Sequence, residues 1–294
     1  MFNCPPEIGL SNEVKLTPRS YLPLTSTIIL AWFLTFLSKL ARMSYPKPII
    51  TPVEEPAPTT PPTQALTNPA PYLNTIIIIG LITASGVVIL YIARKKPTLF
   101  RILIGVLLWL ISFSITTIYL INASFTIHPI FLRFWIPVSA LVASIITYLI
   151  FSDNEISSAI AASYIASGAG GTIGMSIPYW TFLVLTVGIS AYDVFAVYKG
   201  HLSSLTKGEA ASLKGLTVEI GSIVIGLGDL FFYSLTISAI LWNFGEIPAA
   251  AATLAIIAGY TLTLTLLQRK KIVPGLPIPL ISAIISAFLA NMLI

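Results

Sequence analysis

The sequence predicts an all-α membrane protein with nine transmembrane helices, and two observations support this fold class. Hydrophobic residues make up 56% of the 294 residues and charged residues only 9%, whereas a soluble domain typically carries about 25% charged residues. The apolar residues also fall into long blocks of the length that a helix needs to cross a bilayer, about 20 residues. So few charges cannot cover a water-facing surface, and one membrane domain is therefore expected.

The nine predicted helices are separated by stretches that carry charges or prolines. Their ranges are Tyr21–Ser38, Leu73–Ala93, Ile102–Ile121, Phe134–Phe151, Ile156–Gly174, Pro178–Tyr198, Ile220–Trp242, Ile247–Leu267 and Leu276–Ile294. The break between the fifth and the sixth rests on Pro178, because proline is favoured at a helix start, where its missing N–H would be unpaired anyway.

A segment rich in proline and threonine, Tyr45–Pro71, separates the first predicted helix from the rest. Such a composition is typical of an extended, poorly folding linker. We therefore expect a tether without a chemical role, and a first helix that packs loosely against the other eight. The chain then divides into residues 1–44 with the first helix, the linker 45–71, and residues 72–294, with the functional core at 176–294.

The distribution of basic residues favours a cytoplasmic N-terminus and a C-terminus outside, because Lys and Arg concentrate in cytoplasmic loops. With that orientation, the outside segments hold only four of the 16 basic residues, namely Lys39, Arg42, Lys47 and Arg133. The cluster from Lys39 to Lys47 is the one conflict. The expected location is the cell membrane, with several passes through it.

Composition also argues against several classes of site. Cys4 is the single cysteine, and the two histidines, His128 and His201, lie far apart in the sequence. No internal disulfide, metal site or cofactor is therefore expected. The net charge of +5 suits contact with the lipid bilayer rather than nucleic acid. The first twenty residues carry charges and lack a short apolar core, so no cleavable signal peptide is expected.

Two acidic residues, Asp193 and Asp229, lie well inside predicted helices, whereas the other nine fall in loops or at helix edges. A charged group near the bilayer centre costs at least about 2.5–3.5 kcal/mol and therefore marks a candidate functional site. No Lys or Arg lies within a predicted helix to pair with either one. Each aspartate is therefore expected to be the partner of the other.

The predicted topology allows the two side chains to meet. Asp193 is six residues before Lys199, or about 9 Å along the sixth helix. Asp229 is ten residues after Glu219, or about 15 Å into the antiparallel seventh helix. The difference is about one helical turn, which helix tilt can absorb.

Two carboxyl groups in a site of low dielectric share one proton, and the pair then titrates as a unit. Such a pair can hydrolyse a peptide bond, because one group activates water while the other hydrogen-bonds the carbonyl oxygen. It also suits a proton relay in a transporter or channel, although we find no convincing internal repeat of the kind that transporters show. Hydrogen bonding to neighbouring helices is the third reading, and from this pattern alone proteolysis and transport are equally favoured.

The residues around the aspartates distinguish these alternatives. The sixth helix reads Ala191-Tyr192-Asp193 and the seventh reads Gly226-Leu227-Gly228-Asp229, while Pro274-Gly275-Leu276-Pro277 opens the ninth. In order and helix assignment, these motifs resemble the Tyr-Asp, Gly-x-Gly-Asp and Pro-Ala-Leu motifs of the presenilin and signal peptide peptidase family. The resemblance covers residues from about 155 to 294. Prepilin-type peptidases also carry Gly-x-Gly-Asp, but they usually have fewer spans and lack the proline motif.

The resemblance implies a presenilin-like fold and an intramembrane aspartic endopeptidase that cleaves transmembrane helices of other proteins. It implies that Asp193 and Asp229 are the catalytic pair. The remaining motif residues are expected to shape the site or bind substrate, namely Tyr192, Gly226, Leu227, Gly228, Pro274, Gly275 and Leu276. The glycines before Asp229 would let another backbone approach closely, and Tyr192 would offer a hydroxyl.

Two departures from the family pattern modify these expectations. Gly275 stands where the family has alanine, which keeps the position small but adds backbone freedom. The Lys199–Glu219 loop is short, so we expect an active single chain without the maturation cut of presenilins. Assembly into a homo-oligomer is left open.

Two further expectations concern backbone contacts. An unwound substrate is expected to pair as a strand with backbone near the seventh or ninth helix, with a contribution from the loop at Lys207–Lys214. Gly170 and Gly174 form a Gly-x-x-x-Gly pattern on the fifth helix, which favours tight packing against a neighbour.

Overall fold

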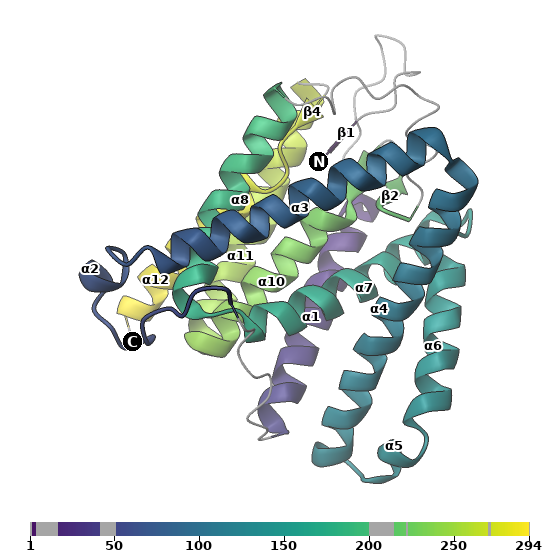
Figure 1. Ribbon diagram of the computed structural model, residues 1–294, viewed down its shortest axis with the longest axis horizontal. Helices are drawn as coiled ribbons and strands as arrows, with labels where there is room; N and C mark the ends of the chain where they lie inside the picture. The colour runs from purple at the N-terminus through teal and green to yellow at the C-terminus, as the bar shows by residue number, and fades with distance from the viewer. Residues whose placement is uncertain are drawn as a thin grey trace.

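The chain folds into a bundle of long helices with a small sheet near one end (Figure 1). This computed structural model describes residues 2–3, 17–41, 51–199, 215–221, 223–269 and 272–293. The helices are η1 (Pro18–Tyr21), α1 (Leu22–Leu40), α2 (Pro62–Ala65), α3 (Ala70–Lys95), α4 (Pro97–Thr126), α5 (Ile130–Arg133), α6 (Trp135–Ile150), α7 (Glu155–Ser176), α8 (Tyr179–Lys199), α10 (Leu227–Asn243), α11 (Glu246–Arg269) and α12 (Pro277–Met292).

All predicted helix ranges except the seventh fall on one helix each, with ends that differ by a few residues. Among the described residues, five helical segments are long and apolar enough to cross a membrane. They are Pro18–Leu40, Ala70–Lys95, Pro97–Thr126, Tyr179–Tyr198 and Glu246–Arg269. Helices α6 and α12 are shorter apolar helices. The protein is therefore an integral membrane protein with several passes.

The prediction for the seventh helix is wrong at its start. The segment predicted as the end of the loop and the first two turns of this helix contains two short strands, β2 (Thr217–Ile220) and β3 (Ile223–Gly226), which pair antiparallel as a hairpin. The segment is rich in β-branched residues, which favour strands, and Gly221 has a φ of 58°, which suits a tight turn. The helix therefore begins at Leu227 rather than at Ile220.

The hairpin belongs to a four-stranded sheet in the order β2-β3-β1-β4. Strand β1 (Phe2–Asn3) comes from the start of the chain, and β4 (Ile272–Val273) precedes the last helix. Strand β1 pairs antiparallel with both of its neighbours, β3 and β4. The sheet therefore joins three segments that are far apart in the sequence.

Helix α1 packs one of its faces against α7 and α10 (Figure 1). Its buried face carries hydroxyls that bond to other helices, as in the hydrogen bond from Thr35 Oγ1 to Ser238 Oγ of 2.9 Å. Ser26 Oγ donates to Ser163 Oγ at 2.8 Å. Buried interhelical hydrogen bonds of this kind hold helices together in a membrane. The expectation of a loosely packed first helix is therefore wrong.

The described part of the linker, residues 51–71, is also folded against the bundle. The carboxylate of Glu55 accepts hydrogen bonds from the backbone N–H groups of Trp180 and Thr181, at 3.0 and 2.9 Å, and from Thr181 Oγ1 at 2.7 Å. Asn74 on α3 bonds both backbone polar groups of Val53. The expectation of a poorly folding tether is therefore wrong for this part, because acceptors within the linker satisfy the open N-terminus of α8.

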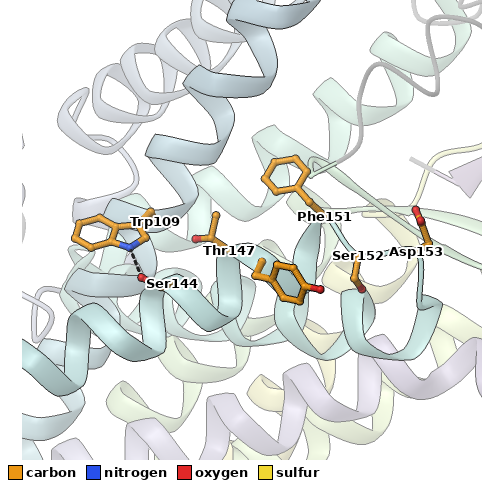
Figure 2. Close-up of a pocket in the computed structure, with 7 residues that line it drawn as sticks. Trp109, Ser144, Thr147, Phe151, Ser152 and Asp153 are labelled. Atoms are coloured by element: carbon orange, nitrogen blue, oxygen red, sulfur yellow. Dashed lines mark hydrogen bonds between the residues drawn. The ribbon is translucent and has the colours of Figure 1, made fainter.

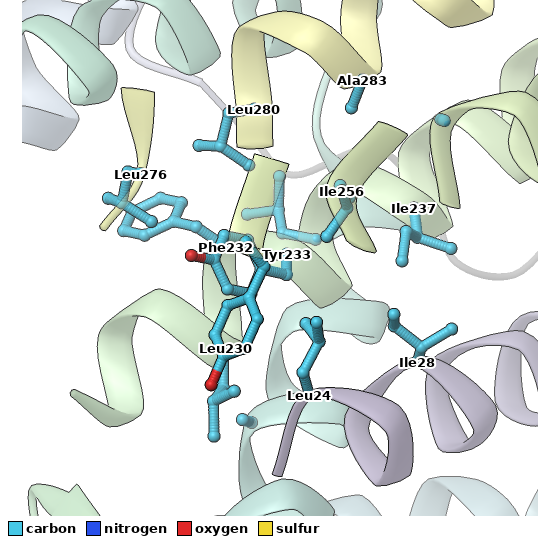
Figure 3. Packing of buried hydrophobic residues seen from close by; sticks show 14 of the residues in the cluster. Leu24, Ile28, Leu230, Phe232, Tyr233, Ile237, Ile256, Leu276, Leu280 and Ala283 are labelled. Carbon is cyan, nitrogen blue, oxygen red and sulfur yellow. The ribbon is translucent and has the colours of Figure 1, made fainter. Parts of the chain in front are cut away.

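The hydrophobic core centres on α10, whose side chains are enclosed by α1, α11 and α12 (Figure 3). Leu24 and Ile28 of α1 and Leu280 of α12 are among the buried residues around it. Helix α7 covers another face of α10, where a Cβ atom on Gly170 or Gly174 would collide with the α10 backbone. The prediction of tight packing at this Gly-x-x-x-Gly pattern is confirmed.

Candidate active site

The structure brings the two predicted aspartates together. Asp193 lies near the C-terminal end of α8 and Asp229 lies in the first turn of α10. Both side chains are buried, with exposed fractions of 9% and 4%. The two carboxyl groups are close enough to interact electrostatically. Two buried acidic groups from α8 and α10 thus interact inside the bundle.

The predicted depth of Asp229 is wrong, because α10 starts seven residues later than expected. Asp229 is the third residue of this helix and follows directly on the β2–β3 hairpin. In this position it lies at the positive end of the helix dipole, which favours a negative charge. The hairpin is fixed in turn by Glu155 of α7, whose Oε2 accepts from the backbone N–H of Gly221 at 3.0 Å.

The proline motif closes one side of the site. The backbone N–H of Leu276 donates to Asp193 Oδ2 at 3.0 Å, and the N–H of Gly275 also bonds this carboxyl group. Pro277 follows at the first position of α12, where it needs no N–H partner. The irregular stretch from Pro274 to Leu276 therefore turns its backbone donors toward the carboxyl group of Asp193.

Tyr233 is a candidate site residue that the sequence motifs did not indicate. Its hydroxyl donates to the carbonyl oxygen of Gly275 at 2.7 Å, and its side chain is fully buried. Tyr233 is four residues after Asp229 on α10, a spacing that places both on one helix face. This spacing is the feature of the sequence that could have indicated Tyr233 as a neighbour of the candidate site. Asp193 and Tyr233 thus hold the same loop from two sides.

A second tyrosine, Tyr260 of α11, packs against the ring of Tyr233. The two rings meet edge to face, with centroids 6.4 Å apart. The Tyr260 hydroxyl donates to the carbonyl oxygen of Ser20 in η1, just before α1, at 2.8 Å. Nothing in the local sequence singled out Tyr260, because its partners come from other parts of the chain.

The other predicted site residues surround Asp229 and Asp193 in different ways. Gly226 ends β3 and caps α10, and Leu227 donates its N–H to the carbonyl oxygen of Leu216 at 2.9 Å. A Cβ atom on Gly228 would meet no described atom within 4 Å, so the residues that the structure describes do not make the close backbone approach expected there. Tyr192 is half-buried and packs against the core.

The loop residues Lys207 and Lys214 lie outside the described residues.

Two cavities lie away from the aspartates. One, of about 650 Å³, lies between α4 and α6, where Trp109 Nε1 donates to Ser144 Oγ at 3.1 Å (Figure 2). The other, of about 540 Å³, is almost entirely apolar and lies between α3, α8 and α12, with Leu66 at its rim. In the part of the chain that the structure describes, no three His, Cys, Asp or Glu residues are grouped to hold a metal ion.

Comparisons with known proteins agree with the residue motifs. A family model described as signal-peptide peptidase, presenilin aspartyl protease matches residues 55–214, a range that includes Asp193 and ends before Asp229. Presenilin-B of Dictyostelium discoideum is 35% identical over 127 residues, which are 39% of this chain and 26% of that protein. The chain thus matches about a quarter of the length of this relative.

Solved structures share the fold. Two structures of a presenilin family intramembrane aspartate protease, in space groups C222 and P2, each superimpose with a TM-score of 0.64. They are 19% and 20% identical in sequence, and each comparison covers 95% of this chain. The comparisons cover 100% and 99% of those chains. At such low identity, the likeness concerns the fold alone.

Proposed function

Because the chain belongs to the signal-peptide peptidase and presenilin aspartyl protease family, we propose that it is an intramembrane aspartic endopeptidase. Its substrates would be the transmembrane helices of other membrane proteins, cut within the bilayer. The observation that supports this proposal is the pair Asp193 and Asp229, which are buried on α8 and α10 and close enough to interact electrostatically. The proposal includes nine membrane-spanning helices, a cytoplasmic N-terminus and activity as a single chain.

The reaction needs the aspartate pair and one water molecule. The ionised carboxyl group takes a proton from water, which attacks the carbonyl carbon of the peptide bond. The protonated carboxyl group donates a hydrogen bond to the carbonyl oxygen and later helps to protonate the leaving amine. Since the pair shares one proton, one carboxyl group can act as base while the other acts as acid.

The substrate must unwind before it can be cut, because a helix keeps its peptide groups in internal hydrogen bonds. The unwound part would pair as a strand with the sheet that leads into the site. Strand β3 runs directly into Gly228 and Asp229, and β4 runs directly into Pro274 and Gly275. The open space beside Gly228 would accept the substrate backbone next to Asp229.

Cleavage of a labelled transmembrane peptide by the purified protein tests the proposal. We expect Asp193→Ala and Asp229→Ala each to abolish cleavage, because neither remaining carboxyl group can act as both acid and base. Asp153→Ala is the matched control, since Asp153 lies beside the cavity between α4 and α6. Full cleavage by both dyad variants would refute proteolysis, and ion flux lost in the same variants without any cleavage would indicate transport.

A further inference from the structure

The sheet beside the aspartates contains a place for one additional strand, and this chain fills it with its own first residues. Strands β3 and β4 are not hydrogen-bonded to each other, because β1 lies between them. Asn3 pairs with Val224 of β3 on one side and with Ile272 of β4 on the other. Without β1, both inner edges would present unpaired backbone N–H and C=O groups.

The position between β3 and β4 leads directly to both halves of the candidate active site. Phe2 pairs with Val273, the residue before Pro274. Since β1 is antiparallel to β3, the end of β1 that carries Phe2 faces the end of β3 that continues into Asp229. A backbone in this position therefore extends toward the aspartates.

We propose that the gap between β3 and β4 binds one extended peptide backbone, and that the chain's own Phe2–Asn3 occupies it as an internal competitor of the substrate. This inference rests on the proposed function, because the competing ligand is the unwound part of a transmembrane substrate. Backbone hydrogen bonds supply the binding, as in other cases of strand addition. Both ligands need the same donors and acceptors, so their binding is mutually exclusive.

Because β1 is short, a longer substrate strand can displace it from the gap between β3 and β4. Among the described residues, two residues of β1 pair with the sheet, whereas β3 offers the four residues Ile223–Gly226. A substrate segment that pairs along the whole of β3 would form more hydrogen bonds than β1 does. The N-terminal strand would therefore protect the two edges at rest and yield to a longer strand.

Disulfide formation between β1 and β3 measures this occupancy without requiring any cleavage. In a Cys4→Ser, Asp193→Ala background, Asn3→Cys and Val224→Cys should cross-link under mild oxidation. An excess of the transmembrane peptide should at least halve the yield. The matched control is Glu219→Cys with Val224→Cys, the partner pair within the β2–β3 hairpin, whose yield should not change. A first pair that does not form, or that the peptide leaves unchanged, would overturn the inference.

A second measurement uses the active protein. Asn3→Pro removes the backbone N–H of the central strand, while Asn3→Ala keeps it. We expect Asn3→Pro to raise kcat/KM for the peptide about threefold or more, mainly through a lower KM, and Asn3→Ala to leave it within twofold. Equal kcat/KM values for the two variants would overturn the inference. If no variant cleaves the peptide, proteolysis fails, whereas peptide-sensitive cross-linking would still support the shared binding position.

Discussion

The residues around the aspartates form a connected set of hydrogen bonds rather than an isolated pair. Asp193 accepts from the N–H of Leu276, and Tyr233 donates to the carbonyl of Gly275. The loop between β4 and α12 is therefore held through two adjacent residues by two different helices. Its conformation, and with it the surroundings of the dyad, depends on both contacts.

Replacing Tyr233 with Phe tests this dependence. The substitution keeps the buried ring but leaves the Gly275 carbonyl without its donor, which costs about 1–3 kcal/mol when the acceptor stays buried. We expect cleavage of the transmembrane peptide to fall about tenfold or more and the melting temperature to fall measurably. Tyr148→Phe is the control, because Tyr148 is 75% exposed on α6. Wild-type activity in Tyr233→Phe would refute a role for this hydroxyl.

At the scale of elements, α8 carries Asp193 near one end and is fixed at the other by the linker. Glu55 accepts two N–H groups of the first turn of α8, and Trp180 Nε1 donates to the carbonyl oxygen of Ala57 at 3.2 Å. An acidic group at a helix N-terminus satisfies free donors and complements the helix dipole. The linker is thus a structural part of the helix that presents one aspartate.

The matched substitutions Glu55→Gln and Glu54→Gln separate this capping from simple loss of charge. Glu55→Gln removes the charge and replaces one acceptor oxygen with a donor, so stability should fall by about 1 kcal/mol. Glu54 is exposed, and its substitution should change stability by less than about 0.5 kcal/mol. Thermal unfolding in detergent, followed by tryptophan fluorescence, measures both variants. Equal melting temperatures would contradict the capping role.

For the whole molecule, hydrophobicity predicted most of the helices, and the motifs predicted which side chains meet. The error at Ile220–Gly226 arose because an apolar, β-branched run of this length is compatible with a helix or with a buried strand. The order Asp193, Asp229 and Pro274–Leu276 was enough to propose a candidate site, since each motif adjoins a helix end. The sequence could not indicate Tyr260, because its role depends on contacts with Tyr233 and Ser20, which come from other parts of the chain.

The sequence also could not predict that the linker and α1 pack against the rest of the protein. A proline-rich segment on its own predicts an unfolded linker, whereas here Val53 and Glu55 find partners on α3 and α8. Likewise, the hydroxyls of Ser26 and Thr35 gave no signal in a helix of ordinary hydrophobicity. Their partners, Ser163 and Ser238, are more than a hundred residues away.

The antiparallel pairing of β1 with both neighbours means that β3 and β4 point the same way. The gap between them therefore has a polarity, since an incoming peptide is antiparallel to both strands or parallel to both, and antiparallel pairing is slightly more stable. Because a spanning helix enters with a fixed direction, the enzyme would select substrates by which terminus faces the cytoplasm. We expect one substrate to be cleaved at least tenfold more slowly when it spans the bilayer in the opposite orientation, as measured in proteoliposomes in which the orientation of the enzyme is fixed. Equal rates would show that the sheet does not discriminate between the two directions of the substrate backbone.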